Sequence, residues 1–304
     1  MFSHYFWIMK VLITGANGFL GHYLTGQLLT KGIAVIATGK GECRLPYSDN
    51  RLFQYQSLDF TDPEAVQRII GNSRPDVIVH SGALSKPDEC EQHKDYADKV
   101  NIDGTRHLLE AAAAVQSFFI FISTDFIFDG KEGMYTEEDK GNPVNYYGLT
   151  KLRAEALVQQ YVFDWSIVRT VLVYGKPLTG RGNILTVVKE KLEKAEEYSV
   201  FDDQVRTPTF VEDLAAGIVA IMQRRATGIF HLSGKDILTP YQMACETADY
   251  LGLNKLLIKK VTAAIFSQPA MRPAKTGFNI EKARRELGYD PVSFDEGIRK
   301  TFDI

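Results

Sequence analysis

A chain of 304 residues is long enough for one large domain or two smaller ones with a sizeable buried core. Its composition is 45% hydrophobic and 24% charged with a net charge of -3, which is typical of a soluble globular protein and argues against a nucleic-acid partner or an anionic membrane surface. The three cysteines, Cys43, Cys90 and Cys245, are far apart and form neither a disulfide framework nor a metal-binding motif. We therefore expect a cytoplasmic protein without a metal site.

The chain begins with a short apolar stretch, MFSHYFWIM. It has no basic region and no small-residue cleavage site, so it is a poor signal peptide. Met9 opens the pattern MKVLITG, and we interpret residues 1–8 as an extension. No apolar run approaches the roughly 18 residues that span a bilayer.

The first half of the chain alternates short apolar runs with amphipathic segments. Alternating strands and helices predict βαβ units and a parallel sheet, and near-continuous apolar runs such as DVIVH indicate strands buried on both faces. The expected fold is α/β, a doubly wound parallel sheet of the Rossmann type with a smaller mixed α/β lobe. Strands are predicted over 10–14, 34–38, 52–56, 76–80, 117–123 and 165–170, and helices over 18–32, 62–71, roughly 95–114 and 146–161.

The second half is less regular. Residues 180–222 contain two helical patterns separated by a polar loop, 228–234 predicts another strand, and Thr239 and Pro240 are typical of a helix start. We assign residues 1–170 and about 212–236 to the cofactor-binding domain. The remaining stretches, about 171–211 and 237–304, are assigned to a substrate-binding lobe.

A glycine-rich turn, TGANGFLG, joins the first predicted strand to the first predicted helix. Gly15, Gly18 and Gly21 permit a tight turn and close approach of the backbone to a pyrophosphate at the helix N-terminus. Glycines can also be mere turn residues, but the strand before and the helix after are the context that dinucleotide binding requires. The turn therefore predicts a dinucleotide site.

The end of the second strand bears on the choice of dinucleotide. NAD-binding folds usually place an acidic residue about 20 residues after the glycines, and NADP-binding ones a basic residue. Here Thr38 is followed by Lys40 and Arg44, with Glu42 already in the loop. We expect NADP(H) to be preferred, with NAD(H) as the alternative, unless the two cations are ordinary solvated loop charges.

Two further strand ends are expected beside the dinucleotide. Asp59 and Phe60 follow the third strand, where an adenine edge would bind, and the small residues Ser81, Gly82 and Ala83 follow the fourth. Ligands in open α/β sheets bind at these carboxyl ends. Both assignments are positional, and both segments also fit ordinary tight loops.

Catalytic groups are predicted from the segments FISTDFIFDG and NYYGLTK. Tyr147 and Lys151 are four residues apart and share a helix face, whereas Tyr146 pairs with Thr150. Tyrosine has a pKa of ~10, and we expect a lysine one turn away to lower it by favouring the phenolate. With Thr124 to hydrogen-bond a carbonyl oxygen, this set predicts carbonyl reduction.

These motifs resemble the extended short-chain dehydrogenase/reductases, through TGANGFLG, STD and YGLTK. More narrowly the chain resembles the dTDP-4-dehydrorhamnose reductase family, through RPDVIVHSGAL, NIDGTRHLLEAA, NYYGLTKLRAE, DDQVRTPTFVEDLA and MRPAKTGFNIEKARRELG. The resemblance implies reduction of the 4-keto group of a nucleotide-activated deoxysugar, most of all dTDP-4-dehydro-L-rhamnose. It also implies a nucleotide-sugar partner and is compatible with a homodimer.

The resemblance assigns roles to individual residues. It implies that Thr124, Tyr147 and Lys151 are catalytic. The expected cofactor-binding residues are Gly15, Asn17, Gly18, Phe19, Leu20, Gly21, Thr38, Lys40, Arg44, Asp59, Phe60, Ser81, Gly82, Ala83, Asn101, Ser123, Tyr147 and Lys151. The expected substrate-binding residues are Ser85, Thr124, Asp125, Phe126, Leu172, Asn183, Gln204 and Arg206. For Arg206 the alternatives are a diphosphate contact and an ion pair with Asp202 or Asp203.

Three departures or alternatives remain open. Family reductases often carry a tryptophan where this chain has Leu172, which removes a stacking face and leaves the sugar undecided. An epimerase or dehydratase is an enzymatic alternative, although Phe126 stands where dehydratases carry a glutamate. The segments GIFHLSG, TPYQMACETADYLGL and MRPAKTGF also resemble the regulatory subunit of methionine adenosyltransferase, a non-catalytic alternative.

Overall fold

A computed structural model of the chain describes residues 9–178, 182–262 and 268–302. The prediction for residues 1–8 lies outside this part. Seven parallel strands form the central sheet in the order β10-β6-β5-β4-β1-β2-β3. The order reverses between β1 and β4, which opens a crevice at their carboxyl ends. The strands are β1 Lys10–Thr14, β2 Ala34–Gly39, β3 Phe53–Ser57, β4 Val77–His80, β5 Phe118–Thr124, β6 Trp165–Thr170 and β10 Gly228–His231.

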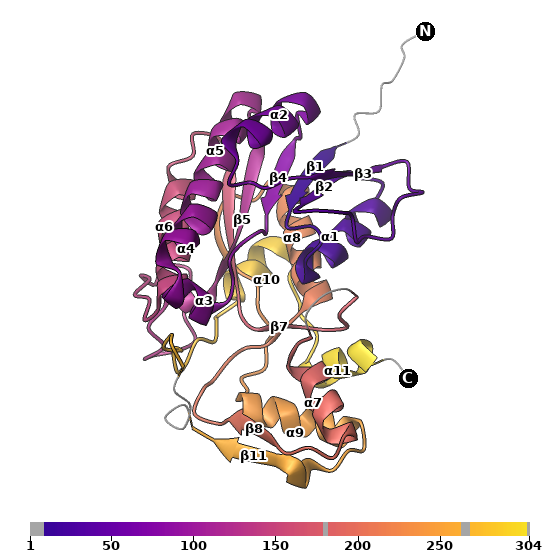
Figure 1. Cartoon of the computed structure of the whole chain (residues 1–304), viewed down its shortest axis with the longest axis vertical. Helices are drawn as coiled ribbons and strands as arrows, with labels where there is room; N and C mark the ends of the chain where they lie inside the picture. Colours follow the sequence, from indigo (N-terminus) through magenta and orange to yellow (C-terminus); the bar gives the residue numbers. More distant parts are fainter. Residues whose placement is uncertain (1–8, 179–181, 263–267, 303–304) are drawn as a thin grey trace.

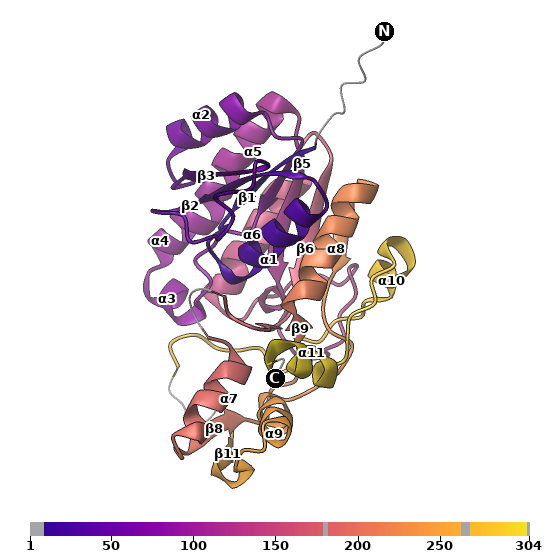
Figure 2. The same ribbon diagram turned by 90° about the vertical axis from the view of Figure 1, so that its right-hand side faces the viewer.

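Helices cover both faces of this sheet (Figures 1 and 2). Alternate residues of β1 point to opposite faces, as strand geometry requires: Val11 and Ile13 join one apolar core and Leu12 joins the other. The doubly wound α/β prediction is confirmed. One layer contains α1 Phe19–Thr30, α8 Val211–Arg224 and α10 Glu281–Leu287, and the other α2 Pro63–Ser73, α5 Gly104–Val115 and α6 Tyr146–Gln159.

The predicted helix over 95–114 is interrupted. The structure has α3 Pro87–Gln92, α4 Lys94–Asp98 and a π-helical turn, Lys99–Asp103, before α5 begins. The wider π turn carries the buried Asn101, whose side chain bonds the backbone of Leu84 and the Thr150 hydroxyl. Tertiary hydrogen bonds therefore override the regular helical pattern here.

A smaller lobe lies beyond the carboxyl ends of the sheet strands (Figure 1). The region predicted as a polar loop between two helices contains two short strands, because each finds a parallel partner elsewhere: β8 pairs with β11, and β9 pairs with β7. The helix after Thr239 is confirmed, with a capping box between Thr239 and Gln242. The elements are β7 Val173–Tyr174, α7 Ile184–Glu193, β8 Tyr198–Phe201, β9 Thr209–Phe210, α9 Pro240–Tyr250, β11 Ile258–Val261 and α11 Phe294–Phe302.

A buried ion pair joins α6 to the sheet. Glu155 is 1% exposed and Arg169 is 3% exposed. Arg169 donates from Nε and Nη2 to the two carboxylate oxygens of Glu155, at 3.1 and 2.8 Å. Ser123 at the end of β5 donates to the same carboxylate at 2.5 Å. One side chain of α6 therefore ties the helix to both β5 and β6.

Removing one member of this pair is expected to destabilise the fold strongly. Arg169→Met leaves the Glu155 carboxylate buried without its countercharge, which should lower the free energy of unfolding by about 3–5 kcal/mol. The double variant Arg169→Met/Glu155→Leu should recover much of that loss, since neither charge then remains. Urea unfolding followed by circular dichroism measures both.

The control is the exposed pair of Arg225 and Asp164, 2.7 Å apart with side chains 58% and 49% exposed. Asp164→Asn should change stability by about 1 kcal/mol or less. If the double variant at the buried pair were as unstable as the sum of its single variants, the two charges would not be coupled.

Candidate functional site

The glycine-rich loop folds tightly against the end of β4. Gly15 has a φ of +69°, and a Cβ there would lie 2.9 Å from the backbone of Gly82. A Cβ on Gly21 would lie 2.5 Å from the Cα of Ala16. Gly18 precedes α1 and provides no side-chain cap. The first backbone N–H groups of α1 are therefore directed at the crevice without a capping side chain, an arrangement that suits an anion.

Asn17 fixes the loop after β2 against the glycine-rich loop. Its carboxamide accepts a hydrogen bond from the backbone N–H of Arg44 at 2.9 Å. It donates to Glu42 O and to the Tyr55 hydroxyl, both at 2.9 Å. The Asn17 side chain therefore joins the loop after β2 to the glycine-rich loop and keeps Arg44 beside the glycines.

Lys40 lies at the expected 2′ position, but it is already paired. Its Nζ is 2.8 Å from the Asp59 carboxylate, and both side chains are about half exposed, at 54% and 44%. Thr38 is buried, and its hydroxyl donates to Ile13 O. A phosphate binding at Lys40 would therefore compete with Asp59 for the ammonium group.

The ring of Phe60 is used inside the protein. A Cβ on either Gly82 or Gly104 would lie 2.5 Å from this ring, so the two glycines make room for it. The ring also meets His80 edge-on at 5.1 Å. The Phe60 ring is therefore packed against other residues of the protein.

His80 ends β4 as a fully satisfied buried histidine. Its Nδ1 is 2.7 Å from the Thr14 hydroxyl and its Nε2 is 3.1 Å from the Thr105 hydroxyl. Burial lowers the pKa of His80 well below its ordinary value. His80 is thus a structural residue, and Ser81 next to it donates to Thr14 O at 2.6 Å.

The first turn of α6 lies directly on the segment that follows β5. Asn145 caps the helix by accepting from Gly148 N at 2.8 Å and donates to Met271 O at 2.7 Å. A Cβ on Gly148 would lie 2.0 Å from Phe126 O, so only glycine allows this approach. The glycine within NYYGLTK thus brings Tyr147 next to the end of β5.

The two adjacent tyrosines point to different surroundings. The Tyr146 hydroxyl donates to the Asp98 carboxylate at 2.9 Å on the outer side of the helix. Tyr147 instead lines the same cavity as Thr124, and its ring meets that of Phe126 at 6.0 Å. Helical spacing alone predicts this difference.

Lys151 is buried one turn after Tyr147. Its Nζ donates to Ile122 O at 2.8 Å and lies 3.8 Å from the centre of the Phe121 ring. Burial lowers the pKa of Lys151 to about 7, while Glu155 one turn further opposes that change. The nearby carboxylate and the ring both favour the charged form.

The expectation that Lys151 lowers the pKa of Tyr147 is not met. Burial raises the pKa of Tyr147 well above its ordinary value, and the hydrogen bond with Thr124 opposes this only in part. Lys151 is not among the groups that shift the pKa of Tyr147 in this arrangement. A phenol in this environment keeps its proton until a negative charge develops nearby.

These groups line a cavity of about 420 Å³ at the carboxyl ends of the strands. The predicted residues that line it are Phe19, Leu20, Ser81, Ala83, Ser85, Ser123, Thr124, Asp125, Phe126, Tyr147, Lys151 and Leu172. The lining residues that sequence reasoning missed are Pro87, Ile122, Thr170, Val173 and Leu214. Most of the missed residues are apolar and carry no motif signal.

A second cavity of about 710 Å³ reaches into the smaller lobe. It shares Phe19, Ser85, Leu172 and Val173 with the first, so the two cavities adjoin. The predicted Asn183 and Gln204 also line it, but Asn183 caps α7 and donates to Gly175 O. The amide nitrogen of Gln204 has no partner among the described residues.

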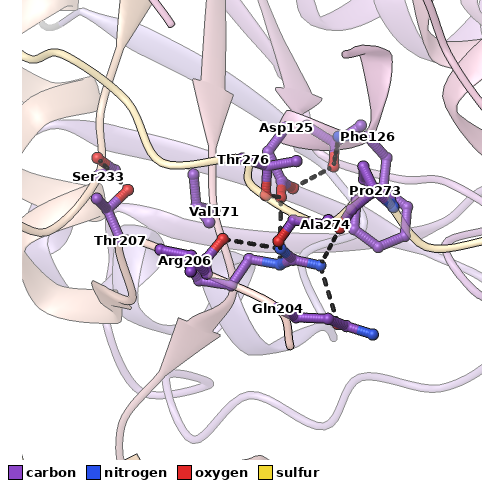
Figure 3. A network of polar contacts seen from close by, with 12 residues as sticks. Asp125, Phe126, Val171, Gln204, Arg206, Thr207, Ser233, Pro273, Ala274 and Thr276 are labelled. Carbon is purple, nitrogen blue, oxygen red and sulfur yellow. Dashed lines mark hydrogen bonds and ion pairs between the residues drawn. The ribbon is translucent and has the colours of Figure 1, made fainter. Parts of the chain in front are cut away.

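Arg206 is turned away from both cavities. It is 3% exposed, and its Nη groups donate to Val205 O, Ala274 O, Pro273 O and the Gln204 side chain (Figure 3). The Nη hydrogens are taken by protein oxygens and Nε lies 3.9 Å from the buried Asp125 carboxylate, so the prediction of Arg206 as a substrate contact is not supported. Nor does Arg206 pair with Asp202, which bonds Lys260 and Thr239 instead.

Within residues 9–178, 182–262 and 268–302, no three His, Cys, Asp or Glu side chains lie together in a way that would hold a metal ion. No helix within them is both long and apolar enough to cross a membrane.

The sequence analysis also missed two buried polar residues beside the cavity, Glu155 and Thr276, and a sequence pattern could have indicated only the first. Glu155 follows Tyr147 and Lys151 at helical spacing, so all three share a face of α6. Thr276 has no such signal, because only the fold brings it to Asp125, 151 positions away.

Residues 9–304 match the family described as RmlD substrate binding domain. A solved dTDP-4-dehydrorhamnose reductase from Clostridium acetobutylicum is 32% identical, with a TM-score of 0.86, covering 97% of this chain and 99% of that one. The dTDP-4-dehydrorhamnose reductase from Bacillus anthracis, solved in complex with NADP, is 28% identical with a TM-score of 0.85, covering 98% and 99%.

A second kind of relative has the same sequence identity to this chain as the Clostridium reductase. Methionine adenosyltransferase 2 subunit beta from Bos taurus is 32% identical over 259 residues, which cover 83% of this chain and 75% of that protein. Both comparisons agree with the nearly full-length family match, and the chain belongs to the RmlD substrate binding domain family.

Proposed function

We propose that this protein is a cytoplasmic reductase that uses NADP(H) to reduce the 4-keto group of a nucleotide-activated deoxysugar, with dTDP-4-dehydro-L-rhamnose as the first candidate. The observation that carries the proposal is the meeting of Thr124, Tyr147 and Lys151 in the first cavity, beside the glycine-rich loop. The likeness to two dTDP-4-dehydrorhamnose reductases supports it.

The residues around the crevice fit a dinucleotide. The pyrophosphate would meet the free N–H groups at the start of α1, and Lys40 and Arg44 would meet a 2′-phosphate. Gly82 and Ala83 would let the nicotinamide end pass toward Tyr147. The bound dinucleotide supplies hydride chemistry.

Tyr147 is the proton donor in this proposal. Its raised pKa keeps the phenol protonated, and it would give the proton to the 4-oxygen as negative charge develops there. The buried Lys151 would stabilise the phenolate that remains and hold the nicotinamide ribose. Lys151, Tyr147 and Glu155 all lie on one face of α6, so their relative positions are fixed by the helix.

The second cavity is the proposed place of the nucleotide and diphosphate. It adjoins the first and is lined by Gln204, whose amide nitrogen has no partner among the described residues. A buried polar group without a partner is costly unless a ligand satisfies it. Two adjoining cavities suit a bulky nucleotide sugar better than a small alcohol.

The direct experiment combines purified protein, NADPH and dTDP-4-dehydrorhamnose and follows the loss of the reduced nicotinamide absorbance. Turnover should depend on both substrates. A nucleotide sugar without a 4-keto group serves as the control. Tight NADPH binding without oxidation of any nucleotide 4-keto sugar would contradict the reductase proposal.

A regulatory subunit of a synthetase is the second candidate, because the subunit beta from Bos taurus is as similar in sequence as the reductase. A quarter of that protein's length has no counterpart in this chain, however, whereas the reductase is covered almost completely. Co-purification with a synthetase catalytic subunit, without sugar reduction, would favour this alternative.

Tyr147→Phe tests the proton donor. Without the phenol proton, turnover should fall by about a hundredfold or more, since general acids contribute that much. Tyr146→Phe is the matched control and should leave turnover nearly unchanged, because it loses only the outer bond to Asp98. NADPH binding should survive both changes. A larger loss for Tyr146→Phe would reverse the assignment.

The pair of Lys40 and Asp59 tests the choice of cofactor. Lys40→Ala should weaken NADPH binding much more than NADH binding, because a 2′-phosphate loses its cation. Asp59→Asn should have the opposite effect, since it frees Lys40 and removes a competing negative charge. Fluorescence titration with both dinucleotides measures the ratio. Equal losses for both dinucleotides in Lys40→Ala would refute the role.

A further inference from the structure

The segment 270–272 is fastened to α3 by a two-point ion pair. Arg272 donates from Nη1 and Nη2 to the two carboxylate oxygens of Asp88, at 2.6 and 2.7 Å. Its Nη1 also donates to Ala270 O at 2.5 Å, and Ala270 N donates to the Asp88 carboxylate at 3.1 Å. Arg272 lowers the pKa of Asp88, so this carboxylate is ionised at neutral pH. A paired guanidinium and carboxylate of this kind fix direction as well as distance, and the backbone leading into Met271 is therefore held against α3.

Met271 uses its backbone rather than its side chain. The residue is 67% exposed, and its carbonyl oxygen accepts a hydrogen bond from the Asn145 carboxamide at 2.7 Å. The oxygen of the same carboxamide accepts from Gly148 N at 2.8 Å and so caps α6. A carboxamide is planar, so the bond to Met271 O also sets the direction of the capping oxygen. One side chain thus joins the segment 270–272 to the first turn of α6.

α3 also contacts the start of α6 directly. Tyr146 N donates to the Glu91 carboxylate at 2.9 Å. The first N–H groups of a helix have no acceptor within the helix, and Glu91 supplies one. Glu91 lies three residues after Asp88 in α3. The bonds therefore close a ring that runs from α3 through the segment 270–272 and the cap of α6 back to α3.

Tyr147 lies in the stretch of α6 that this ring holds, between the cap residue Asn145 and Gly148. It lines the first cavity, as does Pro87 at the start of α3. Among the described residues, Asp88 and Arg272 do not line that cavity. An effect of the ion pair on the reaction must therefore come through the position of the first turn of α6.

We propose that Arg272 is a positioning residue for Tyr147. Its ion pair with Asp88 holds the segment 270–272, and this segment holds the cap that sets the first turn of α6. The proposal rests on the proposed reductase function, in which Tyr147 is the proton donor. It makes the placement of that donor depend on a contact with a residue 126 positions beyond the helix cap.

Arg272→Met tests the ion pair. kcat for sugar reduction should fall about tenfold or more, because a displaced catalytic group loses its alignment with the reacting atoms. The Kd for NADPH and the KM for the sugar should change little, since the altered side chain lies outside the cavity. Asp88→Asn weakens the same pair from the other side and replaces Arg272→Met if that variant does not fold. A loss confined to KM, with kcat unchanged, would overturn the proposal.

Asn145→Ser separates the link to Met271 from the cap itself. Serine still offers a capping oxygen, but it lacks the carboxamide N–H that binds Met271 O. kcat should fall as it does in Arg272→Met. The double variant Arg272→Met/Asn145→Ser should lose little more than the larger single loss, because both changes break one chain of contacts. Losses that multiply would mean that Arg272 does not act through Asn145, and the proposal would fail.

Lys86→Met is the matched control. Lys86 directly precedes α3, and its Nζ lies 3.5 Å from the Glu89 carboxylate, with side chains 62% and 36% exposed. The variant removes a cation from the same helix but leaves the ring of bonds intact. It should leave kcat and KM unchanged. If Lys86→Met lowered kcat as much as Arg272→Met, the effect would be a general disturbance of α3 and the positioning role would be refuted.

Amide hydrogen exchange measures the same effect without substrate. The Gly148 N–H bonds the cap, so its exchange should be about fivefold or more faster in Arg272→Met, as for a weakened helix cap. Lys86→Met should exchange at the rate of the wild type. Wild-type exchange in Arg272→Met would overturn the inference. If the wild type reduced no sugar, the proposed function would fail on its own, and the exchange rate would still decide whether Arg272 holds the first turn of α6.

Discussion

The buried ion pair between Glu155 and Arg169 determines where the reacting face of α6 lies. Glu155 accepts from Arg169 on β6 and Ser123 on β5, so it fixes the helix relative to two strands. Lys151 and Tyr147 lie one and two turns earlier on the same face. Their positions over the end of β5 therefore follow from a contact that no ligand needs to make.

A second buried carboxylate, Asp125, lies at the same strand end. Ser123 and Thr124 are adjacent at the end of β5 and bond Glu155 and Asp125 respectively. One carboxylate is paired within the sheet layer by Arg169. The other is paired by Arg206, which comes from the segments leading to the smaller lobe. The end of β5 is thus the place where the central sheet and the segments leading to the smaller lobe meet the proposed catalytic groups.

How much the sequence could predict depends on how far apart the interacting residues are along the chain. The sheet strands and the glycine-rich turn depend on local patterns, and the structure has them where they were expected. The helix predicted over 95–114 and the polar loop of the smaller lobe depend on tertiary contacts, and there the structure differs. Arg206 shows the limit. Its residue type and loop position fit a ligand contact, yet two of its four Nη acceptors lie 67 and 68 positions away in the chain. Local sequence does not reveal whether a buried cation faces protein or substrate.

The groups proposed for proton transfer and the residue expected to select the sugar belong to different parts of the structure. The groups proposed to transfer a proton belong to β5 and α6, whose geometry is set inside the sheet layer. Leu172 belongs to the connection toward the smaller lobe, touches both cavities and has a φ of +32°, a region that non-glycine residues rarely adopt. Such strain persists only where surrounding structure imposes it, here through the bond from Thr209 N to Leu172 O. A leucine in place of a stacking ring at this junction is therefore expected to alter which sugar fits, while the proposed proton donor stays where α6 holds it.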